Sequence, residues 1–243
     1  MKKHIVVLAA VALGAFSTTA QEAESSALSV SPSVAYESEY IFRGKSCAEA
    51  VITPAVDFAY GDFYFGTWFA IPVENATQYV NEMDVYAGYS TAINSIFSID
   101  VGLCHYAYDD FIDDFDSKDN SLEFYAGASA DVILSPSLYI YRDVDLLTYT
   151  VEASIGHSIA LMEDKVSLDL GLSLGHVETE YDGELDYTYV CPTVDISYAL
   201  TDYSTISFGV RYSAATEDFV GDYNTVNPDS DCLWFGTSLS ASF

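Results

Sequence analysis

Alternation of large apolar residues with polar or very small ones runs through most of this 243-residue sequence. It is clearest at residues 233–243, because every second side chain of an extended strand points to the same face. One face of that segment carries Leu233, Phe235, Thr237, Leu239, Ala241 and Phe243, and the other carries Trp234, Gly236, Ser238, Ser240 and Ser242. A lipid-facing strand of an outer-membrane barrel and an edge strand of a soluble sandwich would both show this pattern.

We predict about twelve such strands along the chain. They cover residues 31–43, 50–60, 62–72, 81–91, 95–108, 120–133, 137–143, 146–160, 165–178, 186–200, 203–214 and 232–243. Tight turns near 61–62, 92–94, 135–136, 162–164 and 201–202 alternate with mostly longer polar loops around 44–49, 73–80, 109–119, 179–185 and 215–231. Such a layout predicts an all-β, transmembrane, antiparallel up-and-down β-barrel with short periplasmic turns and longer extracellular loops. A soluble periplasmic β-sandwich is the more distant alternative.

Residues 1–20 have the features of a secretory signal peptide. Lys2 and Lys3 form a basic head, residues 5–16 are apolar, and Ala20 ends a small-residue cleavage site. No later run reaches the roughly 18 apolar residues that a membrane helix needs. We therefore expect a short N-terminal segment at 21–30 and an outer-membrane β-barrel at 31–243, exported in a Gram-negative bacterium.

Acidic residues greatly outnumber basic ones. Loss of the signal peptide removes two of the eight Lys and Arg residues and none of the 37 Asp and Glu residues, which leaves six bases and a formal charge of −31. Nucleic acid and anionic lipid surfaces are poor partners for this charge, whereas cations are good ones. An acidic bias of the whole organism would give the same composition, so the positions of the acids matter more than their number.

The charged residues of the predicted strands fall on the face opposite the apolar series. A Lys or Arg at mid-depth in lipid costs about 2–4 kcal/mol, so we expect these side chains to point into the barrel. The predicted pore-lining and selectivity residues are twelve of these charged residues and three aromatic residues on the same face. They are Glu37, Glu39, Arg43, Asp57, Trp68, Glu82, Asp84, Tyr86, Asp100, Glu123, Tyr125, Glu152, Asp169, Asp195 and Arg211. Arg43 is expected to pair with Glu82 or Asp84 across the lumen. Such a lumen suits a constriction that selects small or cationic solutes, and it also suits a hydrogen-bonded plug that stabilises a closed barrel.

Short motifs in the first third of the chain resemble those of a known family. They are Tyr40-Ile41-Phe42-Arg43-Gly44, Phe65-Gly66-Thr67-Trp68-Phe69-Ala70 and Glu82-Met83-Asp84-Val85-Tyr86-Ala87-Gly88-Tyr89, continued more weakly by Glu123-Phe124-Tyr125-Ala126-Gly127 and Gly175-His176. These motifs resemble the TorF-like porin family of outer-membrane proteins, also called Gcw_chp. The resemblance implies a barrel with porin function and names no substrate. Four cysteines and a very acidic loop at 108–119 depart from the family pattern.

The cysteines suggest one candidate disulfide. Cys47 follows the first predicted strand and Cys232 begins the last, and these two strands are neighbours if the barrel closes. The cell envelope is oxidising, so a bridge between them is permitted. Cys104 and Cys191 fall on strands far apart around the ring and are expected to stay unpaired.

Neither a metal site nor catalysis is predicted. The cysteines lack metal-ligand spacing, only His105, His157 and His176 remain after the signal peptide, and the acidic loop around 108–120 fails the EF-hand spacing at Lys118. We interpret that loop and residues 217–231 as solvated. His176 is the one tolerable general base, and it lacks a serine partner, so we expect no enzyme and no cofactor.

The sequence thus predicts an outer-membrane porin-like channel for passive diffusion of small cationic or neutral solutes. Its expected partners are outer-membrane lipid, small solutes and the barrel-assembly machinery, for which Phe243 is the expected assembly signal. The alternative is a non-conducting surface, adhesion or structural barrel whose acidic loops bind a partner or divalent ions.

Overall fold

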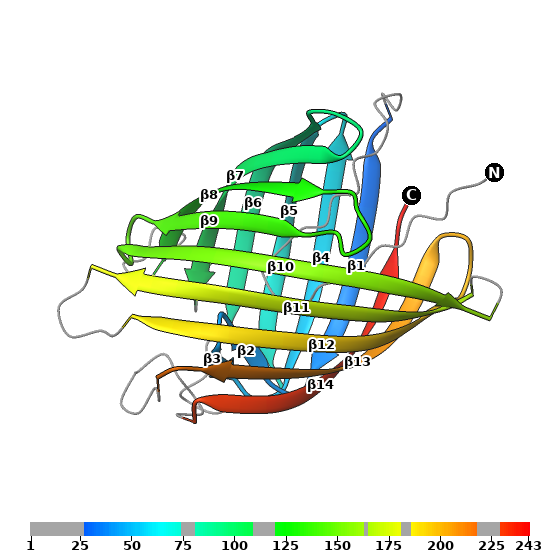
Figure 1. The fold of residues 1–243 in the computed structure, drawn as a ribbon. Coiled ribbons are helices and arrows are strands. Elements are labelled where there is room, and N and C mark those ends of the chain that lie inside the picture. The colour runs from blue at the N-terminus through cyan, green and yellow to red at the C-terminus, as the bar shows by residue number, and fades with distance from the viewer. Residues whose placement is uncertain (1–26, 74–80, 109–119, 163–164, 181–185, 218–228) are drawn as a thin grey trace.

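Twelve strands form a closed antiparallel barrel in the computed structural model, which describes residues 27–73, 81–108, 120–162, 165–180, 186–217 and 229–243 (Figure 1). The barrel strands are β1 (Ser29–Glu37), β4 (Val51–Tyr60), β5 (Phe63–Pro72), β6 (Glu82–Ala92), β7 (Phe97–Tyr108), β8 (Ser121–Ala130), β9 (Ser137–Asp143), β10 (Thr148–Leu161), β11 (Val166–Thr179), β12 (Tyr187–Ala199), β13 (Ser204–Ala215) and β14 (Asp231–Ala241). Each strand pairs with the barrel strand that follows it, and β1 pairs with β14. The prediction of a twelve-stranded up-and-down barrel is confirmed.

The alternation of side chains gives the barrel an apolar outside. On β14, Leu233 is 69% exposed and Phe235 48% exposed, whereas Trp234 between them is only 5% exposed. The same division occurs on β11, where Leu172 and Leu174 are exposed and Asp169 is buried. Strands of period two therefore place one apolar series outside and one mostly polar series inside.

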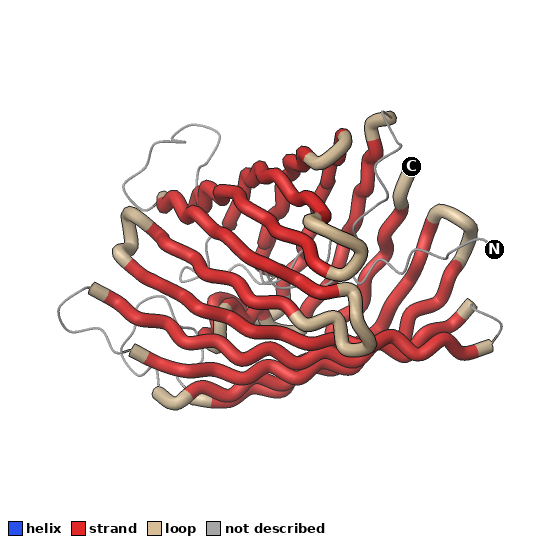
Figure 2. Tube along the Cα trace, turned by 45° about the horizontal axis from the view of Figure 1, so that its top comes forward, coloured by secondary structure: helices blue, strands red, loops and turns tan. Residues whose placement is uncertain are grey.

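Connections at the two ends of the barrel differ in length, as the sequence indicated. At one end, two to six residues join consecutive strands, and at the other the connections run from four to fifteen residues. The short connection at the long-loop end is 144–147, between β9 and β10. Strands make up most of the described chain (Figure 2). No helix long and apolar enough to cross a membrane occurs in that part of the chain.

The seam between β1 and β14 is an ordinary antiparallel pairing. Its register sets Ser33 opposite Ser240 and Glu37 opposite Gly236. Beyond the end of β14, the backbone of Phe243 continues the pairing with Val30 through two hydrogen bonds of 3.0 and 3.1 Å. Closure leaves the first and last strands without an unpaired edge, so the ring needs no other element to complete it.

The first predicted strand departs from the structure. Residues 31–43 were expected as one strand, but β1 begins at Ser29 and ends at Glu37. The next residues form a small separate hairpin of β2 (Tyr40–Phe42) and β3 (Lys45–Ala48). The chain then enters the second barrel strand at Val51. This hairpin is the one part of the described fold that the strand pattern did not anticipate.

Candidate functional site

The residues predicted to line the lumen lie mostly on the inner face of the barrel. Glu37, Glu82, Asp84, Tyr86, Asp100, Glu123, Glu152, Asp169 and Arg211 are buried, and Asp57, Trp68, Tyr125 and Asp195 share their face and are half-buried. The residues between them in sequence, such as Leu103 and Phe124, are exposed on the outside. Glu39 and Arg43 lie outside the barrel strands, in the segment that contains the hairpin. The wall of the lumen therefore carries a clear excess of carboxylates.

Arg43 and Gly44 form the turn of the β2–β3 hairpin. Both residues have positive φ, 49° for Arg43 and 86° for Gly44, as a two-residue turn of type I′ requires. Glycine is also required by space, because a Cβ at residue 44 would lie 2.7 Å from the Cβ of Tyr189 on β12. The tip of the hairpin thus rests directly against the barrel wall.

Side chains of the hairpin contact strands on widely separated parts of that wall. Arg43 donates two hydrogen bonds to Glu123 on β8, at 2.6 and 2.9 Å, and its guanidinium lies 4.2 Å from the ring centroid of Tyr141 on β9. Phe42 packs against Tyr106 on β7 with ring centroids 6.1 Å apart. The hairpin leaves the wall between β1 and β4, so these contacts show that it crosses the lumen.

The predicted partner of Arg43 was therefore wrong. We expected Glu82 or Asp84, on the assumption that Arg43 ended the first barrel strand. The hairpin instead carries the guanidinium to Glu123. The Phe-Arg-Gly-Lys sequence at 42–45, with a glycine at its centre, was the available signal for a turn.

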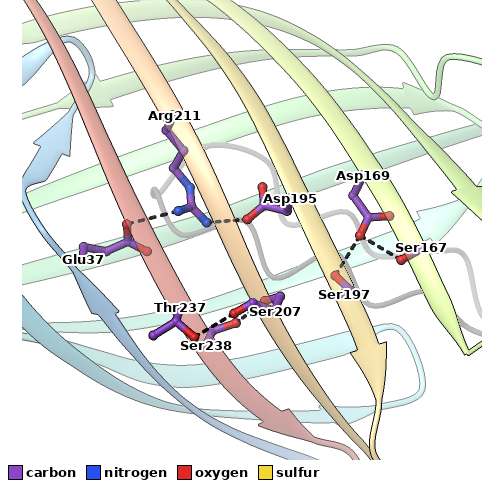
Figure 3. Close-up of polar contacts among 9 residues, drawn as sticks. All are labelled: Glu37, Ser167, Asp169, Asp195, Ser197, Ser207, Arg211, Thr237 and Ser238. Carbon is purple, nitrogen blue, oxygen red and sulfur yellow. Dashed lines mark hydrogen bonds and ion pairs between the residues drawn. The ribbon is translucent and has the colours of Figure 1, made fainter.

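The second lumenal arginine belongs to the wall itself. Arg211 on β13 donates to Glu37 on β1 at 3.2 Å and to Asp195 on β12 at 2.8 Å (Figure 3). Glycines give both carboxylates their space: a Cβ at residue 209 would lie 1.9 Å from Asp195 Oδ1, and one at residue 236 would lie 2.2 Å from Glu37 Oε1. These three charged residues thus link β1, β12 and β13 on the inner face of the barrel.

Asp169 is a lumenal carboxylate held by hydroxyl groups. It accepts hydrogen bonds from Ser158 at 2.6 Å, Ser167 at 2.9 Å and Ser197 at 2.8 Å, which belong to three successive strands. Figure 3 shows the bonds from Ser167 and Ser197. Further serine pairs line the same half of the lumen, including Ser207 with Ser238 at 2.6 Å. The part of the lumen formed by the short-turn ends of β10 to β14 is therefore polar and built mostly from small side chains.

Tyrosine hydroxyls hold most of the remaining inward acids. Tyr64 and Tyr139 donate to Asp100 at 2.8 and 3.1 Å, and Tyr64 also lies 2.6 Å from the Tyr125 hydroxyl. Tyr106 donates to Glu123 at 3.0 Å. Two further tyrosine–carboxylate bonds join Tyr86 to Asp57 and Tyr189 to Glu152.

Inward glycines let these tyrosine rings lie flat against the wall. A Cβ at residue 66 would meet Tyr86, one at residue 88 would meet Tyr64, and one at residue 127 would meet the ring of Tyr139 at 2.4 Å. Each of these glycines thus leaves the space that a tyrosine ring of the neighbouring strand occupies.

Several residues that line the lumen were not among the predicted pore-lining residues. Tyr106, Tyr139, Tyr141, Tyr189 and Asp143 are all buried on the inner face. They occupy the same alternating positions as the residues that were selected, so the alternation was the signal for them. The four tyrosines carry no charge and lie outside the family-like motifs, and Asp143 is the last residue of its predicted strand.

The predicted disulfide between Cys47 and Cys232 is not formed, and both residues are thiols. Cys47 lies on β3, which turns into the lumen, and its Sγ lies 3.8 Å from the Lys45 carbonyl oxygen. Cys232 stays on the wall strand β14, beside Glu39. The prediction assumed that residue 47 lies at the end of the first barrel strand, and the hairpin removes that premise. Cys104 and Cys191 are thiols as well.

Phe243 and His176 both lie on the outside of the barrel. Phe243 is 71% exposed and stacks on Tyr203 with ring centroids 6.3 Å apart. His176 Nδ1 lies 3.0 Å from Thr188 Oγ1 at an exposed position. Three predicted segments lie wholly or largely outside the described residues. They are the signal peptide, nearly all of the acidic loop at 108–120 and most of the acidic loop at 217–231.

Comparisons with known proteins agree with the barrel architecture. Residues 20–136 match a family described as "Bacterial protein of unknown function (Gcw_chp)". The fold is similar to that of the KdgM porin, with a TM-score of 0.58 and 16% identity over 88% of this chain and 99% of that one. It is also similar to the NanC porin, with a TM-score of 0.55 and 12% identity over 88% and 99% of the two chains.

A third similar structure is the COG4313 outer membrane channel from Pseudomonas putida F1, with a TM-score of 0.53 and 9% identity over 88% of this chain and 95% of that one. A search of curated proteins with the sequence gives no match. The chain thus matches the Gcw_chp family over its first half and has the twelve-stranded barrel fold found in outer-membrane porins.

Proposed function

We propose that this protein is an outer-membrane porin-like channel for passive diffusion of small cationic or neutral solutes. The single observation that supports the solute preference is the composition of the inner wall. Buried or half-buried carboxylates point inward from strands all around the ring, whereas the two inward arginines are already bound to Glu123, Glu37 and Asp195. Charged side chains that line a pore set its ion preference, and an acid excess favours cations.

The outer surface supports a membrane location. Leucine, isoleucine, valine and phenylalanine side chains are exposed on barrel strands around the ring. In water such a surface would promote association, whereas in a bilayer it meets hydrocarbon. Similar structures that are outer-membrane porins and channels add to this argument by fold alone.

The inner wall of this barrel is poorly suited to the ligand described for one similar structure. The KdgM porin is described in complex with disordered oligogalacturonate. A ligand with carboxylate groups would meet an inner wall with an excess of carboxylates here, which disfavours its passage. We therefore expect small cations and neutral molecules to pass more readily than organic anions.

Planar-bilayer recording of the refolded full-length protein tests the proposal. We expect discrete conductance steps, and in a KCl gradient a reversal potential displaced toward the potassium equilibrium potential. The double variant Asp57→Asn/Asp100→Asn should move the reversal potential back toward zero, because it removes two inward charges and keeps acceptors for the tyrosine hydroxyls.

The matched control removes two acids from the outer rim, with Glu178→Gln/Glu180→Gln at exposed positions. This variant should leave the reversal potential close to that of the wild type. Correctly folded protein without conductance steps would refute the channel and favour the non-conducting surface barrel. Conductance with anion preference would refute the proposed solute class.

A further inference from the structure

We propose that the β2–β3 hairpin sets the size and charge selectivity of the channel, and that the Arg43–Glu123 pair holds it across the lumen. This inference rests on the proposed channel function and assigns that selectivity to one element. Four features of the structure support it: the hairpin is dispensable to the barrel, it crosses the lumen, it is held there by a buried ion pair, and it changes the charge of an acidic cluster.

The barrel does not need the hairpin in order to close. Glu37 of β1 and Val51 of β4 are direct partners in the strand register. The residues adjoining them, 38–39 and 49–50, would be enough to connect the strands as a four-residue turn, which is a common hairpin length. β2 and β3 form their own two-stranded sheet, separate from the barrel sheet. Side-chain contacts with the wall therefore decide where the hairpin lies.

The strongest of the described contacts is the pair of Arg43 and Glu123. Their side chains are 8% and 3% exposed, and the two parallel hydrogen bonds have the bidentate geometry that makes arginine–carboxylate pairs strong. Loss of either partner leaves the other charge buried and unpaired. The pair thus stabilises the docked hairpin only while both charges are present.

Weaker contacts hold the hairpin on either side of this pair. Tyr40 packs on Trp68 of β5 with ring centroids 5.4 Å apart, and Lys45 Nζ lies 5.4 Å from the ring centroid of Tyr187 on β12. Since β5 and β12 belong to opposite halves of the ring, the hairpin divides the cross-section at the long-loop end. A solute that enters from that end must pass beside it or displace it.

Arg43 also changes the charge of the passage. Glu123 lies close enough to Asp84 to interact with it electrostatically, and Asp84 adjoins Glu82. The guanidinium therefore compensates one member of a cluster of three acids. Removal of Arg43 should strengthen the preference for cations, and removal of Glu123 should weaken it.

Two variants of the ion pair test the inference, because they should change the charge selectivity in opposite directions and the size limit in the same direction. Arg43→Gln and Glu123→Gln both break the pair, so both should raise single-channel conductance and admit larger neutral sugars in liposome-swelling assays. Arg43→Gln should shift the reversal potential toward the potassium equilibrium potential, and Glu123→Gln should shift it away. A purely structural role for the pair would not give shifts of opposite sign.

Arg142→Gln is the matched control, because Arg142 forms an exposed ion pair with Glu180 on the outer rim. It should leave both readouts unchanged. If a point variant fails to fold, as judged by heat-modifiable gel mobility, deletion of residues 40–48 replaces it. The deletion should give the largest conductance of the series.

The outcomes separate this inference from the function on which it rests. If the wild type and the deletion variant are both folded and silent, the channel function itself is refuted. If the wild type conducts and the deletion leaves conductance, sugar cut-off and reversal potential unchanged, the channel stands and the role of the hairpin is overturned. Equal shifts of the reversal potential in the two point variants would also overturn it.

Discussion

Arg43 and Glu123 are 80 residues apart in the chain, and two hydrogen bonds of 2.6 and 2.9 Å join them across the barrel lumen. Arg211 is held differently, because all three members of its cluster belong to wall strands. The lumen therefore has one arginine that fixes an inserted element and one that fixes the ring. These two roles lead to different expectations for mutation.

Substitution of Arg211 should lower the stability of the barrel. Arg211→Met leaves Glu37 and Asp195 without their shared cation, and losing one member of a buried ion pair costs about 3–5 kcal/mol. Urea unfolding of the refolded protein in detergent micelles measures the change. Arg142→Met, on an exposed pair worth roughly 0–1 kcal/mol, is the control. Equal losses for the two variants would contradict the role of the Arg211 cluster.

Gly127→Ala should destabilise the wall by overpacking. The added Cβ would lie 2.4 Å from two ring atoms of Tyr139, close to where the ring joins its own backbone, so the ring cannot easily move away. Overpacking of this kind costs about 1–3 kcal/mol. At Gly156 an added Cβ has its nearest contact at 3.6 Å, so Gly156→Ala should be tolerated in the same unfolding assay. If the two variants unfold alike, the ring of Tyr139 does not occupy this space.

The two faces of β11 should respond in opposite ways to a new charge. Leu172 is exposed on the outside and Ser173 points inward beside Cys191. A lysine near the middle of the lipid face costs about 2–4 kcal/mol, so Leu172→Lys should reduce folding into lipid vesicles. Ser173→Lys should fold normally, as followed by heat-modifiable gel mobility. Normal folding of both would argue against a bilayer around this barrel.

Phe243→Ser should reduce the amount of protein assembled in the outer membrane. We expect the exposed aromatic ring to be read by the assembly machinery, whereas the backbone pairing with Val30 does not depend on the side chain. Refolding of the purified variant in detergent should therefore stay close to that of the wild type. Ser242→Ala is the neighbouring control, and unchanged membrane levels of the Phe243 variant would remove the assembly role.

The number and order of the barrel strands and the direction of most side chains could be predicted from alternation together with the turns and loops that separate the alternating segments. A one-residue shift would turn every apolar side chain of β11 inward, so the pattern fixes both faces together. The contact partners could not be predicted in this way, because they depend on how far each chain segment is displaced along the barrel. Arg43 shows the limit: its face was assigned from strand geometry, but a turn at Arg43 and Gly44 placed it on a different element.

The tyrosines show a second limit. Alternation puts Tyr139 and Tyr189 on the inner face, but their hydrogen bonds to Asp100 and Glu152 depend on the glycine notches beside them. A glycine and a tyrosine on adjacent strands become partners only once the register is known. The sequence therefore shows which residues face inward more readily than which of them touch.

The direct pairing of Glu37 with Val51 has a consequence for how such a protein can diverge. The pairing of β1 with β4 is already complete at Glu37 and Val51. The segment between these two residues can therefore change in length or composition without altering any strand pair of the barrel. The hairpin that we propose to set selectivity and the strand pairs that define the fold are thus separate parts of the chain. Substitutions in residues 40–48 can therefore change the passage while every strand pair of the ring stays as it is.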